Sequence, residues 1–131
     1  MYQQLFGGVT ILTRAQFTAI NGYSNRFFGW GGEDDDLYNR VRAQGYRISR
    51  PPMTIARYKM LSHKKDKPNP MRIKILKEGR KRFAWDGLNS LRYRVVRSEE
   101  GQLFTRIVVS IDQAEVMSLD AKSALRKTSN D

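Results

Sequence analysis

The stretch Gly-Trp-Gly-Gly-Glu-Asp-Asp-Asp at residues 29–36 limits the possible fold more than any other part of the sequence. Four neighbouring carboxylates repel one another, so they are best tolerated where positive groups offset their charge. The start of a helix offers such groups, because free backbone N–H groups and the positive end of the helix dipole lie there. The apolar side chains that follow, Leu37, Tyr38 and Val41, have helical spacing, and Gly45 is a suitable helix end. We therefore expect a helix that begins within the acidic run and ends at Gly45.

The acidic run has two interpretations, which the residues alone leave open. The first is helix capping, in which each carboxylate adds about 0.3–1 kcal/mol, although one or two acids would suffice. The second is ligand binding. An aromatic ring such as Trp30 packs against the apolar face of a sugar, carboxylates accept hydrogen bonds from its hydroxyls, and one carboxylate can act as a general base. Gly31 and Gly32 would let the backbone approach such a ligand closely.

Composition favours one folded domain with an anionic partner. The 131 residues are 40% hydrophobic, which suits a single domain with a core and argues against disorder. No run of about 18 apolar residues is present, so no membrane span is expected. The absence of cysteine excludes disulfides and thiolate metal sites. A net charge of +11 favours nucleic acid, an anionic membrane surface or phosphorylated small molecules as partners.

Alternating strand and helix patterns predict an α/β or α+β fold. A short helix should follow Thr13, with Gln16 completing a capping box and Asn21-Gly22 forming the turn that ends it. A basic helix should begin at Met71 and close near Gly79. Strands are expected at residues 5–12, 46–49, 55–61, 91–96 and 103–111, and a frayed helix or disorder after Asp112.

Several of these stretches resemble the β1,4-galactosyltransferase family of inverting, metal-dependent Golgi glycosyltransferases. The resemblance covers residues 5–112 and rests on the WGGEDDD run with its flanks and on RYKMLSH, DKPNP and DGLNSLRY. It implies the C-terminal half of a GT-A-type (Rossmann-like) α/β domain, with a mixed sheet, flanking helices and a mobile loop at residues 62–70. The nucleotide-binding half with its Asp-x-Asp motif is absent, so the resemblance implies a fragment. Residues 1–112 would belong to the catalytic domain and residues 113–131 to a poorly ordered tail.

The resemblance implies an acceptor site for a terminal N-acetylglucosamine. Asp34 would be the catalytic base that deprotonates the acceptor 4-hydroxyl, in a single in-line displacement that inverts the anomeric carbon. Ile73 stands where the family usually has phenylalanine, in the pocket for the acetamido methyl group. The residues implied for the acceptor are Gly32, Glu33, Asp34, Asp35, Arg72, Ile73 and Leu76.

The resemblance also implies a donor and metal site. His63 is the only histidine, and Met60-Leu61-Ser62-His63 matches the family's Met-x-x-His pattern, in which both residues ligate the metal. An imidazole and a thioether beside an upstream aspartate suit Mn²⁺ better than Mg²⁺. A lone loop histidine is otherwise more often structural or exposed, and a methionine more often core. The residues implied for the donor are Leu5, Trp30, His63, Lys64, Lys65 and Asp66, although the lysines also fit a solvated basic loop.

Leu5 bears on which sugar is transferred. The family's galactosyltransferases carry tyrosine directly before FGG, whereas a smaller aliphatic residue accompanies transfer of N-acetylgalactosamine. Leu5 therefore predicts tolerance of, or preference for, the N-acetylgalactosamine donor, with UDP-galactose as the alternative. A competing interpretation is that Leu5 is simply a strand residue facing the core.

The implied whole protein is an enzyme on the lumenal face of the Golgi membrane, held by an N-terminal anchor absent from this sequence. It would act on N-acetylglucosamine-terminated glycans, and the present chain alone would be inactive. A folded but inactive fragment is one alternative. Another is a nucleic-acid-binding module, suggested by the many cations in residues 57–82, but no known motif accompanies them and aromatic residues are not interleaved as stacking platforms. Nucleic acid is therefore not expected as a partner.

Overall fold

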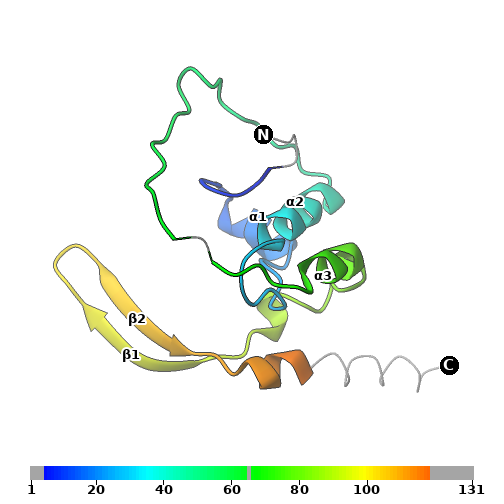
Figure 1. The fold of residues 1–131 in the computed structure, drawn as a ribbon, viewed down its shortest axis with the longest axis vertical. Coiled ribbons are helices and arrows are strands. Elements are labelled where there is room, and N and C mark those ends of the chain that lie inside the picture. The colour runs from blue at the N-terminus through cyan, green and yellow to red at the C-terminus, as the bar shows by residue number, and fades with distance from the viewer. Residues whose placement is uncertain (1–4, 65, 119–131) are drawn as a thin grey trace. The chain divides into compact units, whose positions relative to one another are not determined.

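The computed structural model describes residues 5–64 and 66–118 (Figure 1). The chain divides into two compact units, Met1–Leu88 and Asn89–Asp131. The described residues of the first unit contain the helices α1, α2 and α3, and those of the second contain a two-stranded sheet. None of the described helices is long and apolar enough to cross a membrane.

Helix α1 spans Arg14–Ala19 and begins at the predicted capping box. The Thr13 side chain accepts a hydrogen bond from the Gln16 backbone N–H, and the Gln16 side chain accepts one from the Thr13 N–H at 2.9 Å. These two bonds satisfy donors that would otherwise be free at the helix start. Asn21 and Gly22 both adopt positive φ, at 59° and 62°, so the predicted turn is confirmed.

Helix α2 spans Glu33–Ala43 and carries the core of the first unit. Leu37 and Val41 are 1% and 2% exposed, and with Ile20 they form the buried apolar cluster. The chain leaves the helix through Gly45, which adopts a φ of 77° that other residues rarely tolerate. The predicted start, end and inner face of this helix are therefore confirmed. Five partly buried side chains surround the cluster: Phe6, Leu12, Phe17, Tyr46 and Ile48.

Helix α3 spans Arg72–Glu78 and is followed by the 3₁₀ turn η1 at Gly79–Lys81. Both elements contact α2, so the basic helix predicted to close near Gly79 packs beside the acidic one. A further 3₁₀ turn, η2, spans Leu88–Ser90.

The sheet of the second unit is a hairpin of β1, Arg94–Glu100, and β2, Thr105–Ser110. The strands are antiparallel, with a register shift between Val95 and Arg97. They correspond to two of the five predicted strands. Residues 113–118 are helical, and Asp112 Oδ1 accepts hydrogen bonds at their start; the rest of the predicted tail lies outside the described residues.

The strands predicted at residues 5–12, 46–49 and 55–61 are wrong for this structure. Residues 47–64 run as a long segment without helix or strand (Figure 1). A strand requires a neighbouring strand for its backbone hydrogen bonds, and within the described ranges no strand lies beside these segments. Large apolar side chains of the segment 55–61 are exposed, with Ile55 at 75% and Leu61 at 76%.

Candidate functional site

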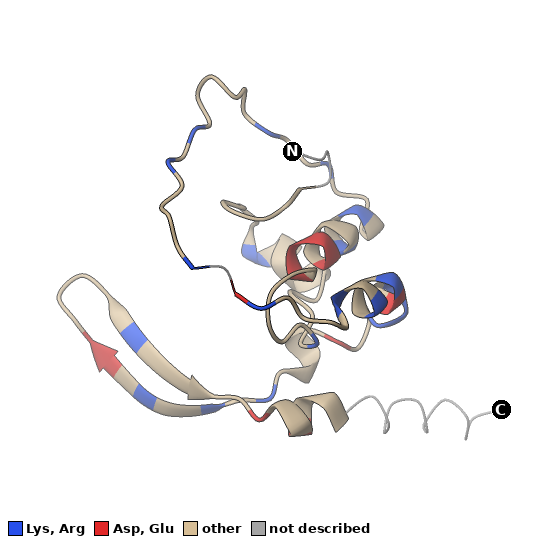
Figure 2. Ribbon diagram, viewed as in Figure 1, with Lys and Arg blue, Asp and Glu red and all other residues tan. Residues whose placement is uncertain are grey.

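The four acids at the start of α2, here called the acidic turn, occupy different environments. Gly31 and Gly32 adopt φ of 103° and 95° and lead the chain into the helix, and no side chain caps it. Glu33 is exposed and Asp34 and Asp35 are half-buried, whereas Asp36 is fully buried. Figure 2 shows the acidic colour concentrated at this end of α2. The run that is uniform in sequence therefore splits into three accessible carboxylates and one internal carboxylate.

The carboxylate of Asp34, the predicted base, contacts the Asp35 backbone N–H and Gly7. Its Oδ1 accepts a hydrogen bond from the Asp35 N–H at 2.9 Å. Its Oδ2 lies against Gly7, where an added Cβ would come within 2.7 Å of that oxygen. Such an approach is tighter than real Cβ atoms show, so the glycine makes room for the carboxylate. The Gly7-Gly8 pair of the sequence thereby meets the acidic turn.

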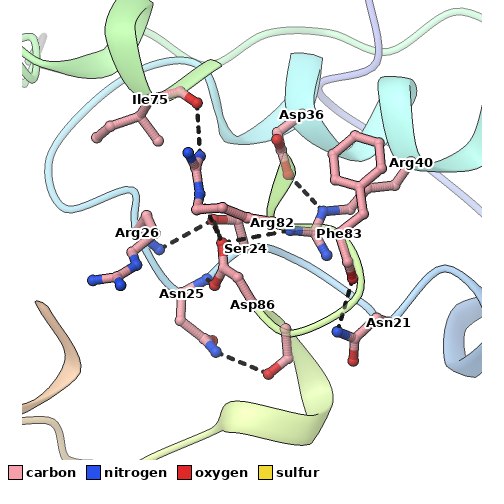
Figure 3. A network of polar contacts seen from close by, with 11 residues as sticks. Asn21, Ser24, Asn25, Arg26, Asp36, Arg40, Ile75, Arg82, Phe83 and Asp86 are labelled. Atoms are coloured by element: carbon pink, nitrogen blue, oxygen red, sulfur yellow. Dashed lines mark hydrogen bonds and ion pairs between the residues drawn. The ribbon is translucent and has the colours of Figure 1, made fainter. Parts of the chain in front are cut away.

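Asp36 belongs to a buried ionic network (Figure 3). Arg40 Nε donates to Asp36 Oδ2 at 2.6 Å, and its Nη2 lies 3.5 Å from Asp86 Oδ2. Arg82 Nε lies 3.5 Å from the same Asp86 oxygen. Burial raises the pKa of Asp36, and the hydrogen bond from Arg40 opposes that rise. Because Asp36 has no access to a ligand, its role is to hold α2 in place.

Asp86 extends this network to the loop that precedes the acidic turn. The Ser24 hydroxyl donates to Asp86 Oδ2 at 2.5 Å, and the Asn25 N–H donates to Oδ1 at 2.8 Å. Asn25 Nδ2 also donates to the Gly87 carbonyl at 2.8 Å (Figure 3). Asp86 and Gly87, from the DGLNS stretch, therefore hold this loop in place, a role that was not predicted from the sequence.

Trp30 and Arg72, predicted to contact donor and acceptor, lie side by side. The Arg72 guanidinium carbon is 5.8 Å from the centre of the Trp30 ring, a cation–π distance. The backbone N–H of Trp30 donates to the Lys67 carbonyl at 3.3 Å, and the backbone N–H of Asn69 donates to the Trp30 carbonyl at 2.9 Å. These two bonds tie the glycine-rich loop to the segment before α3. The indole nevertheless stays 57% exposed, so one face is available to a ligand.

Tyr23 is a site residue that the sequence analysis missed. Partial burial, and then the negative charges of Glu33 and Asp34, raise its pKa above the usual value of 10.0. Its ring packs edge-on against Phe17 at 6.1 Å. The negative charges of the acidic turn therefore favour the neutral form of the phenol. The sequence offers one indication that Tyr23 belongs to the site: it lies at the start of the aromatic loop, directly after the Asn21-Gly22 turn.

The remaining predicted residues are less closely grouped. On α3, Ile73 is 52% exposed and Leu76 is half-buried. Leu5 is half-buried, and its carbonyl accepts a hydrogen bond from Arg50 Nη2 at 2.9 Å. The predicted donor residues His63, Lys64 and Asp66 are exposed, and Lys65 lies outside the described residues.

The predicted metal ligands fit a metal in part. Met60 is 86% exposed, and His63 Nδ1 lies 3.1 Å from the Lys64 carbonyl. Within the described residues no group of three or more His, Asp and Glu side chains could hold a metal ion. An imidazole and a thioether suit a borderline transition metal such as Mn²⁺ better than Mg²⁺, but they provide two ligands only. Further ligands would have to come from another source, so this pair stays a prediction.

The groups of this arrangement have the chemistry to contact a carbohydrate. An exposed indole, a stacked guanidinium and half-buried carboxylates are gathered at the start of two helices. The ring can cover the apolar face of a sugar, and the carboxylates can accept hydrogen bonds from its hydroxyls. One of them can also accept a proton.

Comparisons with known proteins agree with this chemistry. A family model described as the N-terminal domain of galactosyltransferase matches residues 1–64. Mouse beta-1,4-galactosyltransferase 2 is 47% identical over 115 residues, which are 86% of this chain and 31% of that protein. Rat beta-1,4-galactosyltransferase 3 is 46% identical over 113 residues, or 84% of this chain and 29% of that protein. The chain thus spans about a third of the length of these curated relatives.

Two solved structures of Drosophila β1,4-galactosyltransferase 7 have a similar fold. Its catalytic domain in complex with xylobiose matches with a TM-score of 0.66, and a point mutant in complex with manganese, UDP-Gal and xylobiose matches with 0.70. Each match has 25% identity and covers 88% of this chain and 53% of the other. They confirm the expected GT-A-type α/β fold class. The family description names an N-terminal domain where the resemblance indicates the C-terminal half, so the half to which this chain belongs stays a prediction.

Proposed function

Because the chain belongs to the β1,4-galactosyltransferase family, we propose that it forms the acceptor side of an inverting glycosyltransferase. The enzyme moves N-acetylgalactosamine or galactose from a UDP-sugar to the 4-hydroxyl of a terminal N-acetylglucosamine. By family, we further propose that the whole protein is a membrane-anchored enzyme that works on the lumenal side of the Golgi membrane. The observation that carries the proposal is the half-buried Asp34 carboxylate, seated against Gly7 in a turn that follows the exposed Trp30.

In the proposed mechanism each residue of the acidic turn has a separate task. The Asp34 carboxylate accepts the proton of the acceptor 4-hydroxyl as that oxygen attacks the anomeric carbon of the donor. Glu33 and Asp35 accept hydrogen bonds from neighbouring hydroxyls and orient the sugar. Trp30 contacts the donor sugar-phosphate and helps to order the acceptor. The other groups proposed to line the acceptor are Gly32, Arg72, Ile73 and Leu76. Because the acceptor 4-hydroxyl itself displaces the UDP leaving group in a single step that inverts the anomeric carbon, no covalent enzyme intermediate and no nucleophile from the protein are required.

The donor side is proposed from the segment that precedes α3. His63 and Met60 would hold Mn²⁺, which when bound neutralises charge on the diphosphate leaving group. Lys64 and Lys65 would add positive charge near the diphosphate, and Asp66 would contact the donor. The presence of manganese and UDP-Gal in the complex of the Drosophila enzyme supports this assignment.

Replacement of Asp34 tests the base. In the complete enzyme Asp34→Asn should lower kcat by about 10²–10⁴-fold, the usual worth of a general base, and leave the thermal unfolding curve unchanged. Asp35→Asn is the matched control, because it removes the adjacent charge and should act mainly on the acceptor KM. Near-normal turnover of the Asp34→Asn enzyme would exclude this residue as the base.

Competition between the two donors tests the role of Leu5. We propose that this half-buried aliphatic side chain leaves room for the acetamido group at C2 of the donor sugar. With both nucleotide sugars supplied at equal concentration, the enzyme should transfer N-acetylgalactosamine at least as well as galactose. Leu5→Tyr should shift the ratio of products towards galactose. Transfer dominated by galactose in the unchanged enzyme would refute the proposal.

An inactive fragment is the second candidate, because no group of three or more His, Asp and Glu side chains among the described residues could hold a metal ion. Isothermal titration of this 131-residue chain with Mn²⁺ and a UDP-sugar distinguishes the candidates. Binding of both ligands would show a complete donor site, and weak or absent binding would show that the donor site requires residues outside this sequence.

A further inference from the structure

Asn69 is a buried asparagine between the loop that carries Trp30 and the start of α3. It is 9% exposed, and it is flanked by Pro68 and Pro70, which have no backbone N–H to donate. Its side-chain Oδ1 accepts a hydrogen bond from the Met71 backbone N–H at 2.8 Å. Such a bond, from an asparagine side chain to the N–H two residues on, closes a turn of the backbone. The side chain therefore sets the direction in which the chain enters α3.

The backbone of Asn69 is bonded to two of the predicted site residues. Its N–H donates to the Trp30 carbonyl at 2.9 Å. Its carbonyl accepts two hydrogen bonds from Arg72, one from the backbone N–H at 3.2 Å and one from Nη1 at 3.1 Å. Asn69 thus joins the two residues whose side chains form the cation–π contact at 5.8 Å.

The position of Arg72 also bears on the acidic turn. An added Cβ on Gly31 would come within 2.9 Å of Arg72 Cδ, and one on Gly32 within 3.5 Å of Arg72 Cβ. The stem of the arginine therefore lies close against the two glycines that lead the chain into Glu33. Any displacement of Arg72 would open this packing beside the turn that carries Asp34.

We propose that Asn69 is a positioning residue of the acceptor site. Its side-chain bond to Met71 fixes the turn, and the backbone of the turn then holds Trp30 and Arg72 in place. This inference rests on the proposed function, because it assigns Asn69 to the same site. Asn69 acts through these neighbours and takes no part in proton transfer. Such positioning matters to an enzyme because a misplacement of about 1 Å can cost roughly 10²-fold in rate.

Replacement of Asn69 in the complete enzyme tests the proposal. Asn69→Ala removes the acceptor of the Met71 N–H and should raise the KM for N-acetylglucosamine by about two- to tenfold, the worth of one hydrogen bond. The kcat should change little, because Asp34 is retained. Asn69→Asp keeps an acceptor oxygen and should restore the KM. Asp112→Ala is the matched control, because Asp112 Oδ1 accepts the same kind of bond from the Ala114 N–H at 2.8 Å in the second unit.

A double-mutant cycle with Arg72 separates positioning from a general loss of stability. In an Arg72→Ala enzyme, Asn69→Ala should raise the acceptor KM by a smaller factor, because one of the residues through which Asn69 acts is gone. A purely structural role would give the same factor in both backgrounds. Equal factors would therefore overturn the proposal, and so would an unchanged KM in the Asn69→Ala enzyme or an equal rise in the Asp112→Ala control.

A measurement without substrate separates this inference from the proposed function. In the enzyme labelled with ¹⁵N-tryptophan, the indole N–H signal of Trp30, identified by its loss in Trp30→Phe, should shift in Asn69→Ala as the Arg72 guanidinium moves beside the ring. The signal of Trp85, which lies against Arg26, should stay in place. An unmoved Trp30 signal would overturn the inference. A shifted signal in an enzyme that transfers no sugar to N-acetylglucosamine would support the positioning and contradict the proposed function.

Discussion

At the scale of single residues, four consecutive acids have different roles because the helix turns them to different sides. Successive residues of an α-helix are about 100° apart, so Asp34 and Asp35 are turned away from Asp36, which points inward beside Leu37. Glu33 stays exposed because it is the first residue of the helix. Asp36 also stands one turn before Arg40, at the spacing at which two side chains meet. The sequence analysis left capping and ligand binding open for the whole run. The structure gives Asp36 a separate role, and the three accessible acids remain candidates for ligand contact.

Because the four acids have different roles, replacing them should lower the free energy of unfolding by different amounts. Asp36→Ala leaves the buried Arg40 without its closest partner and should lower the free energy of unfolding by about 3–5 kcal/mol. Glu33→Ala, in the same run, removes an exposed charge and should cost less than about 1 kcal/mol. Urea unfolding of the two variants measures the difference. Equal costs would show that Asp36 acts as a capping charge only.

Tyr23 provides a test of the electrostatics around the acidic turn. Its pKa is raised, so the folded state holds the phenolic proton more tightly than the unfolded state does. The stability that this contributes is present below the unfolded pKa of about 10 and is lost as the pH rises through the folded pKa. An ultraviolet difference titration between the protein and Tyr23→Phe should show one phenol that ionises above pH 10. Ionisation at or below the usual value would contradict the proximity to Glu33 and Asp34.

At the scale of elements, the acidic and basic helices pack closely because one residue lacks a side chain. Gly79, where α3 passes into η1, has an ordinary helical conformation. An added Cβ would nevertheless collide with Asp36 Oδ1 and touch the Phe83 ring. The glycine is therefore required by the approach of α2 and η1, and not by its backbone angles.

Because Gly79 lies against Asp36, the effects of Gly79→Ala and Asp36→Ala on the free energy of unfolding should not be additive. Gly79→Ala should destabilise the protein by forcing α2 and η1 apart, and Asp36→Ala removes the atom against which the new methyl group would press. The double variant should be more stable than the sum of the single changes implies, by roughly 0.5–3 kcal/mol. Gly45→Ala is the control, because alanine is disfavoured there by the positive φ alone and nothing lies within 4 Å of its added Cβ. Combined with Asp36→Ala, that control should be additive in the same unfolding assay.

The elements also show which parts of the fold the sequence could specify. The helices α1 and α2 were predictable because their signals are local: the Thr13 and Gln16 capping box, the spacing of Leu37 and Val41, and Gly45 at the end. The strands expected before residue 62 were not, because a strand depends on a partner distant in sequence. The hairpin was predictable because its two strands are neighbours. In the site, the hydrogen bond from Ser24 to Asp86 joins residues 62 positions apart, and no local sequence pattern predicts such a contact.

At the scale of the whole molecule, the amount of buried apolar surface is small for 131 residues. The fully buried hydrophobic side chains of the described part are Ile20, Leu37, Val41 and Val116. Many large apolar side chains are exposed, among them Ile11 at 90% and Leu103 at 92%. Since burial of apolar surface is the main favourable contribution to folding, the chain by itself has little to oppose its conformational entropy.

This balance predicts the behaviour of the 131-residue chain expressed alone. It should bind a hydrophobic dye in native buffer, and its thermal unfolding should be broad, with an enthalpy below the roughly 0.7 kcal/mol per residue of ordinary globular proteins near 60 °C. Leu37→Ala, which costs about 2–5 kcal/mol in a packed core, should abolish the remaining transition, whereas Leu103→Ala at an exposed position should not change it. Calorimetry and dye fluorescence measure both effects. A sharp transition with full enthalpy and no dye binding would contradict the prediction, because it would require the exposed apolar side chains to be covered in solution, for example by a second copy of the chain.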